Sequence, residues 1–417
     1  MKRFRNAAVP VMAALTIGLL GGCGDEDTKT SETTSSITAE FDANSDEVKN
    51  KTQKIEDLIN SRFYFSQDEE KREEAYYDGL LEGLDDPYSV YYTADEYSRM
   101  MEDDSGEYVG IGAMVTQNAE TGVISVVRPF RGSPAAKAGL QPKDVFVEIN
   151  GMKLTSDMLL EDVINMIRGE ENTVAELKMY REGEKDYLTF RVERKKVEHI
   201  TVDYEVLDNG FGYIYVEQFI ENTYDQFKEA VDYLTSRNVK ALIIDIRDNP
   251  GGFTSSACSM VDYLLEDDHI AEGDETKTPG LLITMKDKSE KIIQKDSCSD
   301  QHSVDLPIAV LVDEYSASSS EIFAGALRDH KKAILVGVKT YGKGIVQVVY
   351  PLGDGSAVKL TIAAYFLPSG TSVQGDGLVP DAEIEMDMEL RRQIDLPHNK
   401  DVQLQRAITE LGGEPLP

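Results

Sequence analysis

Two runs of consecutive apolar residues, each followed by a sharp turn and a helical pattern, most strongly constrain the fold of this 417-residue chain. The run Lys240–Arg247 leads through a turn at 248–252 into a helix expected at about Ser255–Leu265, and Ile308–Val312 leads into one at about Ser320–His330. Uninterrupted apolar runs indicate strands buried on both faces. Strands alternating with helices predict an α/β core with a largely parallel sheet, where sites lie at the carboxyl ends of strands. Further elements of this pattern are the strand Phe211–Val216, the helix Tyr224–Ser236 and the strand Ala333–Val336.

A glycine-punctuated region of about 90 residues precedes this core. It holds Gly132-Ser133-Pro134-Ala135 with Ala138-Gly139-Leu140, followed by Asp144-Val145 and Ile149-Asn150-Gly151. This order resembles a PDZ domain, which is β-rich with short helices and takes up the ends of peptides. We expect the backbone N–H groups at Gly110, Ile111 and Gly112 to hold a terminal carboxylate, while the adjacent strand pairs with the extended peptide. The alternative is that these glycines only form a tight turn.

The amino terminus has the features of an export signal. Residues 1–5 are basic, and the apolar run Ala7–Leu20 is too short for an ordinary membrane-spanning helix. Leu20-Gly21-Gly22-Cys23 resembles a bacterial lipobox, which predicts a signal peptide at 1–22 and a lipid-modified Cys23. Residues 23–44 then read as a disordered tether, and the protein is expected to be a bacterial lipoprotein on the extracytoplasmic face of the cell membrane. The alternative is an ordinary signal peptide with an incidental cysteine.

Helical patterns flank the two central regions. Residues 45–103 carry an apolar stripe that includes Val48, Ile55 and Leu58, and Leu84-Asp85-Asp86-Pro87-Tyr88-Ser89 interrupts it with a turn. Residues 388–417 are expected to form a helical tail. The terminal helical segments could form a homodimer or brace another domain, or they could simply cover their own chain. The predicted order is therefore 45–103 helical, 104–195 PDZ domain, 196–387 α/β core and 388–417 tail.

Charge and cysteine usage exclude some functions. The net charge of −33 comes from 43 Lys and Arg against 76 Asp and Glu, so the surface repels phosphate backbones and nucleic acid is not an expected partner. Cys258 and Cys298 could pair in an exported protein, but their positions do not establish the geometry. Neither the cysteines nor the five histidines have metal-site spacing, so no metal site is predicted.

The chemistry suggested by the core is that of an activated serine. A serine hydroxyl needs a neighbouring base, and no histidine stands in a distinctive motif. Lys343, between Gly342 and Gly344, could serve if an apolar pocket lowered its pKa, although most lysines are solvated surface charges. Pro250-Gly251-Gly252 could supply an N–H group to an oxyanion hole, or merely connect a strand to a helix. These patterns leave four candidate nucleophiles, since serines before a helix are usually caps: Ser316, Ser318, Ser319 and Ser320.

Several motifs in fixed order resemble the carboxy-terminal processing (tail-specific) serine peptidases. The resemblance runs from about Ser45 to Asp387. The motifs that carry it are Leu84–Ser89, Asn249–Gly252, Ser316–Ile322, Tyr341–Gly344, Gln347, Asp354–Thr361, Pro368–Gly370 and Gly377–Asp381.

This resemblance implies a Ser-Lys dyad supported by a glutamine. Ser318 would be the nucleophile, Lys343 the general base, and Gln347 the residue that positions the lysine amine. The implied oxyanion donors are the backbone N–H groups of Gly252 or Gly251 and of Ser319. Arg168, at the end of the PDZ helix, would couple peptide binding to the active site. Two positions depart from the family pattern: Lys143 precedes Asp144 where glycine is usual, and Ser319 replaces an alanine but keeps its N–H.

We therefore expect an exported lipoprotein endopeptidase that captures free carboxyl-terminal tails of proteins in its PDZ domain and cleaves through an acyl-enzyme on Ser318. No cofactor is expected. Two alternatives are a PDZ peptide-binding scaffold with an inactive protease core and a small-molecule hydrolase on the same fold. The substrate, the cleavage preference, the oligomeric state and any activating partner are left open.

Overall fold

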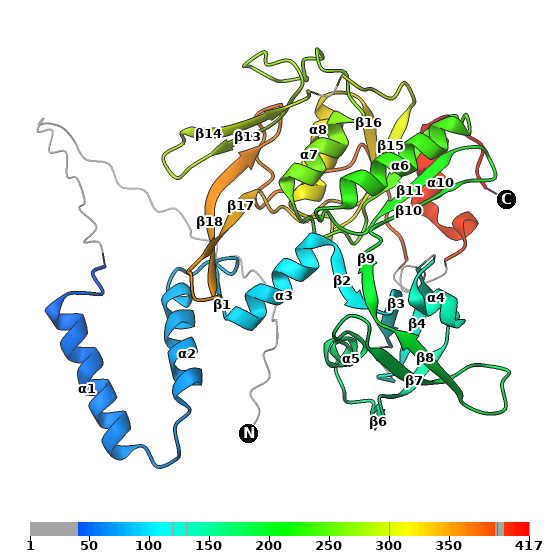
Figure 1. The fold of residues 1–417 in the computed structure, drawn as a ribbon. Coiled ribbons are helices and arrows are strands. Elements are labelled where there is room, and N and C mark those ends of the chain that lie inside the picture. The colour runs from blue at the N-terminus through cyan, green and yellow to red at the C-terminus, as the bar shows by residue number, and fades with distance from the viewer. Residues whose placement is uncertain are drawn as a thin grey trace, which may run out of the picture. The chain divides into compact units, whose positions relative to one another are not determined.

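The computed structural model describes residues 41–118, 121–130, 132–299, 301–387, 390 and 396–416. The predicted signal peptide, Cys23 and most of the predicted tether lie outside these residues. Within them, no helix combines the length and apolar character needed to cross a bilayer. Figure 1 gives the element labels used below.

The N-terminal segment is helical, but it is interrupted more often than the sequence indicates. Helix α1 (Asp46–Arg62) is capped by Ser45, whose hydroxyl accepts a hydrogen bond from the N–H of Val48. The helix belongs to a unit that ends at Gln67. No residue of α1 is buried, so the predicted apolar stripe is not covered within this unit.

The second unit of the chain begins at Asp68. Helix α2 (Glu69–Glu82) is followed by strand β1 (Val90–Tyr92) and helix α3 (Ala94–Ser105). The turn between α2 and β1 holds Asp85 at φ 55° and then Pro87, which together end the helical path as predicted. Strand β1 was not expected.

The PDZ region forms an antiparallel sheet in the order β3-β4-β5-β7-β8, with β6 paired to β5. Strand β3 stands at its edge, and helix α5 carries buried Val163 and Ile167 into its core. Two strands, β2 (Glu107–Gly110) and β9 (Lys195–Glu198), pair at the entrance and exit of the domain. The remaining elements are β3 (Ala113–Gln117), β4 (Ile124–Pro129), α4 (Pro134–Ala138), β5 (Val145–Ile149), β6 (Met152–Lys153), α5 (Leu160–Ile167), β7 (Val174–Tyr180) and β8 (Leu188–Glu193).

The core sheet has the order β10-β11-β12-β15-β16-β19 and is parallel except for the β10–β11 pair. Alternate residues of β12 enter different apolar clusters: Leu242 and Ile244 join one, and Ile243 joins the other. This is why the run is uninterrupted, as the sequence predicted. The elements of this layer are β10 (Val202–Val206), β11 (Gly212–Val216), α6 (Thr223–Ser236), β12 (Leu242–Asp245), α7 (Thr254–Asp262), β15 (Ile308–Val312), α8 (Ser319–Asp329), β16 (Ala333–Gly337) and β19 (Ala382–Glu383).

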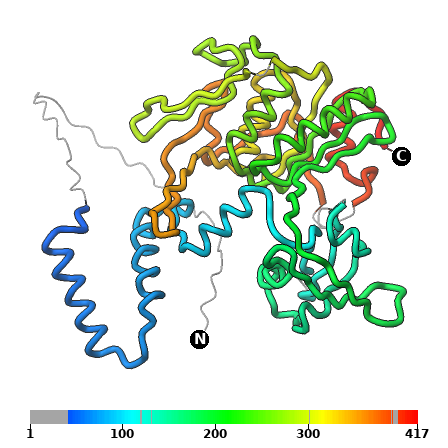
Figure 2. Tube along the Cα trace, in the orientation of Figure 1, coloured from blue at the N-terminus to red at the C-terminus, as the bar shows by residue number. Residues whose placement is uncertain are grey.

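A second, antiparallel sheet has the order β1-β18-β13-β14, and β17 also pairs with β18. Figure 2 shows the blue-to-cyan start of the second unit, from α2 to α3, beside the orange β17–β18 hairpin. Val90 in β1 pairs with Lys359 in β18, which fixes the upstream turn against a distant part of the chain. The bounds are β13 (Leu281–Lys286), β14 (Ile292–Ser297), β17 (Ile345–Pro351) and β18 (Ala357–Phe366).

The end of the chain packs on the core sheet. After the 3-10 helix His398–Lys400, helix α10 (Val402–Glu410) buries Leu404, Ala407 and Ile408 in the same cluster as Ile243. Next to it, the buried guanidinium of Arg247 forms ion pairs with Asp245 at 2.5 Å and Asp401 at 2.8 Å. These contacts tie the carboxyl end of β12 to the start of α10.

Neither Cys258 nor Cys298 forms a disulfide in the described structure. Cys258 is buried in α7, and burial raises the pKa of its thiol well above the ordinary range. Cys298 is half-buried just after β14 and packs against the same core cluster. The structure therefore has no Cys258–Cys298 disulfide, the pairing that the sequence left open.

Candidate active site

Ser318 occupies the sharp turn between β15 and α8. Its backbone has φ 54° and ψ −115°, a strained conformation for a residue with a side chain, and its side chain is half-buried. The other three candidate serines are buried. Their hydroxyls donate to backbone carbonyls of the neighbouring segment: Ser316 to Ile246 at 2.8 Å, Ser319 to Gly252 at 2.8 Å and Ser320 to Asn249 at 2.9 Å. Structural hydrogen bonds thus account for three serines, and Ser318 stands apart from them.

The turn after β12 lies against the Ser318 turn, because β12 and β15 are adjacent parallel strands. A Cβ atom at Gly251 would lie only 2.9 Å from the Ser319 nitrogen. The Gly251 N–H donates to Asn249 Oδ1 at 2.9 Å and is therefore already engaged. Among the described residues, the N–H groups of Gly252 and Ser319 donate to no acceptor. An oxyanion hole requires two N–H groups of this kind, held in place and without an acceptor.

Lys343 approaches from the second sheet, just before β17. Its amine lies 4.2 Å from the centroid of the Tyr88 ring. Burial lowers the pKa of Lys343, the nearby charge of Lys359 lowers it further, and Asp86 acts in the opposite direction. Lowering the pKa of an amine increases its neutral, basic fraction. Within the described structure this amine makes no hydrogen bond to the Ser318 hydroxyl.

One buried carboxylate, Glu321, joins the serine turn to the lysine loop. Its Oε2 accepts from the N–H of Ser318 at 3.0 Å and from the N–H of Lys343 at 2.8 Å. Its Oε1 accepts from the Thr340 hydroxyl at 2.6 Å and from the N–H of Gly342 at 2.8 Å. The sequence interpretation gave Glu321 no role. The signal was present, because Ser-x-x-Glu before a helix is the capping-box pattern.

Tyr365 makes a second connection between the same two loops. Its buried hydroxyl lies 3.1 Å from the Ser318 carbonyl oxygen and 3.0 Å from that of Lys343. Burial raises the pKa of this phenol, so it stays protonated and can donate. The backbones of the serine and the lysine are thus held together from two sides.

Gln347 lies in β17, on a chain of hydrogen bonds that does not include Lys343 itself. Its amide nitrogen donates to Thr361 Oγ1 at 3.2 Å, and the N–H of Thr361 donates to Ser89 Oγ at 3.1 Å. Ser89 in turn donates to Asp86 at 2.6 Å. The described structure contains no hydrogen bond between Gln347 and Lys343. The network instead joins Gln347 to the segment that carries Tyr88.

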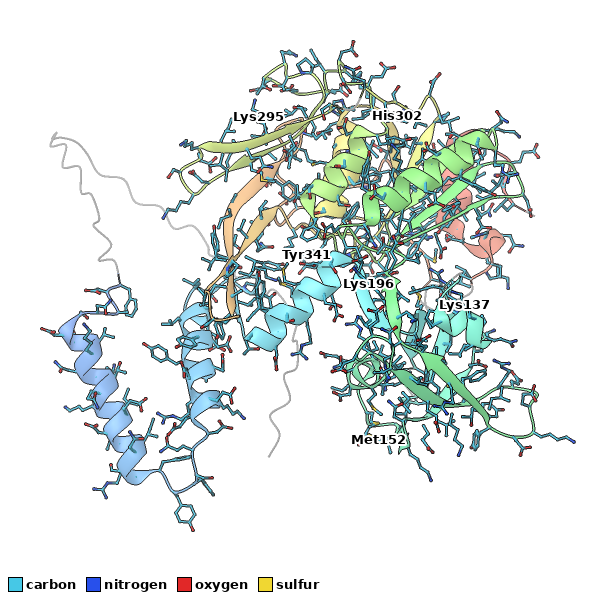
Figure 3. All side chains as sticks on the ribbon, viewed as in Figure 1. Lys137, Met152, Lys196, Lys295, His302 and Tyr341 are labelled. Atoms are coloured by element: carbon cyan, nitrogen blue, oxygen red, sulfur yellow. The ribbon has the colours of Figure 1, made fainter. Side chains whose placement is uncertain are left out.

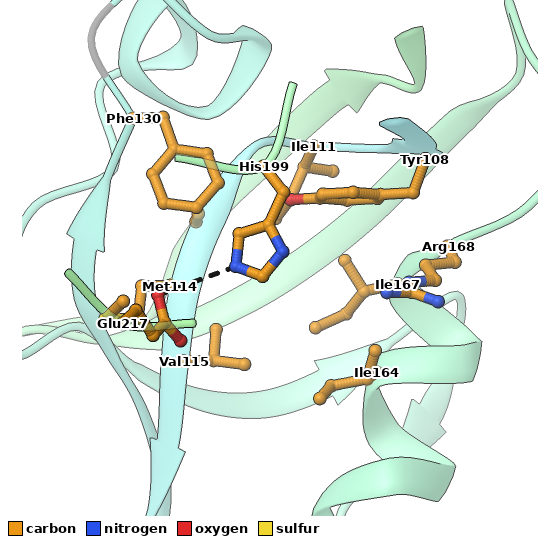
Figure 4. Close-up of a pocket in the computed structure, with 11 residues that line it drawn as sticks. Tyr108, Ile111, Met114, Val115, Phe130, Ile164, Ile167, Arg168, His199 and Glu217 are labelled. Carbon is orange, nitrogen blue, oxygen red and sulfur yellow. Dashed lines mark ion pairs between the residues drawn. The ribbon is translucent and has the colours of Figure 1, made fainter. Parts of the chain in front are cut away.

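The PDZ region contains a cavity of about 200 Å³ between edge strand β3 and helix α5 (Figure 4). Ile111 lines this cavity, and Gly112 follows it in the chain. The N–H groups of both residues donate to no acceptor in the described structure, whereas Gly110 lies in the β2–β9 ladder. Arg168, at the end of α5, also lines it. The complete lining is Tyr108, Ile111, Ala113, Met114, Val115, Phe130, Ile164, Ile167, Arg168, His199 and Glu217.

The Arg168 guanidinium links the PDZ helix to α3. It lies 3.5 Å from a Glu102 oxygen and 3.1 Å from an Asp103 oxygen, and it stacks 4.8 Å from the Tyr108 ring centroid. Its Nε is buried and has no hydrogen-bond partner.

No group of three or more His, Cys, Asp or Glu side chains among the described residues is arranged to hold a metal ion.

Comparison with known families identifies the core that carries Ser318 and Lys343. Residues 210–384 match the sequence model of peptidase family S41. The sequence of this core is thus similar to that of family S41 peptidases. Residues 123–181 match a PDZ domain, and residues 17–96 match the N-terminal domain of the activating protease CtpB. The S41 match contains both the Ser318 turn and the Lys343 loop, and the PDZ match covers strands β4 to β7 and helix α5.

Curated relatives extend the similarity across most of the chain. A "Probable CtpA-like serine protease" of Staphylococcus haemolyticus is 35% identical over 330 residues, which cover 78% of this chain and 62% of that protein. A Staphylococcus aureus protein of the same description is 35% identical, with coverages of 81% and 64%. The chain thus spans less than two thirds of the length of these relatives.

One solved structure supports the same kind of fold. An S41 protease structure from Bacteroides fragilis is 17% identical, covers 84% of this chain and 92% of its own, and has a TM-score of 0.54. The photosystem II D1 C-terminal processing protease is 26% identical, with coverages of 80% and 86% and a TM-score of 0.47. The predicted resemblance to carboxy-terminal processing serine peptidases is confirmed, as is the predicted combination of helical, PDZ and α/β regions.

Proposed function

We propose that this protein is a serine endopeptidase that captures free carboxyl-terminal tails in its PDZ domain and hydrolyses peptide bonds through a Ser318–Lys343 dyad. The observation that carries the proposal is the placement of Glu321. This single carboxylate holds the turn of Ser318 and the loop of Lys343 together, beside the unengaged N–H groups of Gly252 and Ser319. A nucleophile, a base of lowered pKa and two oxyanion donors are the parts that acyl transfer requires.

In the proposed reaction, neutral Lys343 takes the proton of the Ser318 hydroxyl as its oxygen attacks the scissile carbonyl carbon. The negative charge that develops on the carbonyl oxygen is stabilised by the N–H groups of Gly252 and Ser319. Protonated Lys343 then gives its proton to the leaving amine, which departs and leaves an acyl-enzyme. Water, deprotonated by the same amine, hydrolyses the ester and restores Ser318.

The lysine amine has to leave the Tyr88 ring to reach the serine hydroxyl in this scheme. Its backbone N–H is bonded to Glu321, so the movement takes place in the side chain. Gln347 would position the amine in the reacting state. For this, its amide has to exchange its bond to Thr361 for one to Lys343.

Tail capture is proposed for the PDZ cavity. The unengaged N–H groups of Ile111 and Gly112 suit a terminal carboxylate, and the edge position of β3 allows an extended peptide to add to the sheet. Arg168 connects this cavity to α3 and could transmit its occupancy to the core. The match to the N-terminal domain of an activating protease supports an activating role or an activating partner for the N-terminal helices, and the exposed apolar side chains of α1 suit a homodimer.

Cellular location is a further part of the proposal. The basic start, the apolar run and the lipobox-like Leu20–Cys23 segment support export and lipid attachment at Cys23. The protein would then act at the extracytoplasmic face of the membrane.

The test uses an unfolded protein substrate with a free or an amidated carboxyl terminus. Cleavage of the free-tail substrate should be reduced by amidation and abolished in both Ser318→Ala and Lys343→Ala. Ser303→Ala, outside the active site, is the control for serine removal. Cleavage that persists in Ser318→Ala would contradict the assigned nucleophile. If no form cleaves but the free tail still binds, the scaffold alternative is favoured.

A further inference from the structure

Two residues that lie beyond the PDZ sheet complete the PDZ cavity. His199 follows β9, and Glu217 follows β11 in the core. Figure 4 shows the imidazole between the strand residues Met114 and Val115 and the helix residues Ile164 and Ile167. A peptide in this cavity therefore contacts the PDZ sheet and the start of the protease core together.

The Glu217 carboxylate is incompletely paired. Its Oε2 lies 3.6 Å from Nε2 of His199, within ion-pair distance of a protonated imidazole (the dashed line in Figure 4) but beyond hydrogen-bonding distance. No hydrogen bond to the Glu217 side chain occurs among the described residues, and 34% of the side chain is exposed. A carboxylate can accept several hydrogen bonds, so Glu217 retains capacity for a donor supplied by a ligand.

The positive charge of Arg168, which also lines the cavity, is not available to neutralise the Glu217 carboxylate. Arg168 is already engaged by two carboxylates, Glu102 and Asp103, on α3. The polar rim is therefore acidic, whereas the walls are apolar, with Ile111, Phe130 and Ile167 buried.

We propose that the PDZ cavity selects carboxyl-terminal tails that combine an apolar last residue with a lysine or arginine a few residues upstream, and that Glu217 binds this cation. The proposal rests on the tail-capture function and specifies its substrate class. Because Glu217 belongs to the core side of the cavity, the identity of the tail is read by both domains.

The geometry of strand addition gives the position of the cation. A tail whose carboxylate binds at Ile111 and Gly112 runs antiparallel to β3, so its last residue lies near the start of β3 and its earlier residues lie farther along. Met114 and Val115, which line the cavity with Glu217, come two and three residues after Gly112. The cation is thus expected about two residues before the last one.

The test measures peptide binding to the full chain carrying Ser318→Ala, which prevents cleavage. Two fluorescent peptides with free carboxyl ends and a terminal valine differ only at the third residue from the end, lysine in one and norleucine in the other. Fluorescence anisotropy gives each Kd. We expect the lysine peptide to bind about fivefold more tightly, the range of a partly exposed ion pair. Introducing Glu217→Gln as a second substitution in the Ser318→Ala chain should remove this preference for the lysine peptide.

The matched control is Glu184→Gln, an exposed residue between β7 and β8 outside the cavity, which changes the net charge equally. It should leave the lysine preference intact. A preference that survives Glu217→Gln, or that disappears in Glu184→Gln, would overturn the proposal. Equal binding of both peptides with loss of binding on amidation would overturn it while leaving tail capture standing. If neither peptide binds, tail capture fails together with it.

Discussion

The Lys343 amine rests on the face of the Tyr88 ring, 4.2 Å from its centroid. This contact joins the proposed base to a turn that precedes the PDZ domain in the chain. The turn is held by strand β1 and by the hydrogen bond between Thr361 and Ser89. The turn between α2 and β1 is therefore part of the environment of the Lys343 amine.

Replacing Tyr88 by leucine should lower kcat about tenfold, because the ring restricts the lysine side chain to the neighbourhood of the serine turn, from which a side-chain rotation brings the amine to the hydroxyl. Tyr88→Phe keeps the ring and should retain most of the activity. The comparison is made by steady-state cleavage of a free-tail peptide, with thermal unfolding as the check on folding. Equal losses in both variants would contradict a role for the ring and would point to the hydrogen bond between the hydroxyl groups of Tyr88 and Tyr341. Tyr341, labelled in Figure 3, is an exposed residue.

Lys359→Gln should move the acidic limb of the pH–rate profile to higher pH. The positive charge of Lys359 lowers the pKa of Lys343, so its removal raises that pKa. Only the neutral amine acts as a base, and a higher pKa means that more alkaline solution is needed to produce it. Asp86→Asn removes an opposing charge and should move the limb to lower pH. Shifts of the same sign in both variants would contradict this electrostatic account.

Glu321→Gln should destabilise the fold by about 2 kcal/mol and abolish most activity. The amide nitrogen would face N–H donors where a carboxylate oxygen now accepts, leaving buried donors unpaired. Urea unfolding gives the stability change, and cleavage of a free-tail peptide gives the activity. The exposed Glu184→Gln serves as the neutral control. A fully active, fully stable Glu321→Gln enzyme would rule out the connecting role.

Gly252→Ala should reduce kcat by about a hundredfold or more, the effect of losing an oxyanion donor. Gly252 has φ 140°, and an added Cβ would lie 2.1 Å from the Phe219 carbonyl oxygen, so the turn has to move. Gly353→Ala is the control, since it also has positive φ but would place its Cβ in open space. Similar losses in the two variants would show that backbone strain, and not the position of the N–H group, is responsible.

Asp401→Asn should destabilise the protein by about 3 kcal/mol without changing KM. Arg247 is buried between Asp245 and Asp401, and weakening one partner leaves part of a buried charge uncompensated. Urea unfolding followed by fluorescence measures the effect. Unchanged stability would mean that Asp245 alone satisfies the guanidinium.

The α/β core was largely predictable because its strands are buried on both faces and its turns are marked by glycine, proline and serine. The predicted strand Ile308–Val312 agrees with β15 residue for residue. The choice of Ser318 required the family resemblance, since hydroxyl groups of equal chemistry stand at four nearby positions. Only the packed structure shows that the hydroxyl groups of Ser316, Ser319 and Ser320 donate hydrogen bonds to backbone carbonyl groups.

The surroundings of Lys343 were beyond sequence reasoning. Tyr88 and Lys359 reach the lysine through pairing of β1 with β18, a long-range contact that periodicity does not encode. Glu217 and His199 were missed for a similar reason: each follows a strand of its own region, and only the tertiary arrangement brings both into the PDZ cavity. The Ser-x-x-Glu pattern at Ser318 was the one local signal that could have been used.

The double anchorage by Glu321 limits how the proposed activity can be switched. With the backbone of Ser318 and that of Lys343 bonded to one carboxylate, neither loop can withdraw without breaking buried hydrogen bonds. Activation by loop opening would then be slow, whereas rotation about the carbon–carbon bonds of one lysine is fast. A regulator would then need only to redirect a single side chain, and it could do so without moving the N–H groups of Gly252 and Ser319.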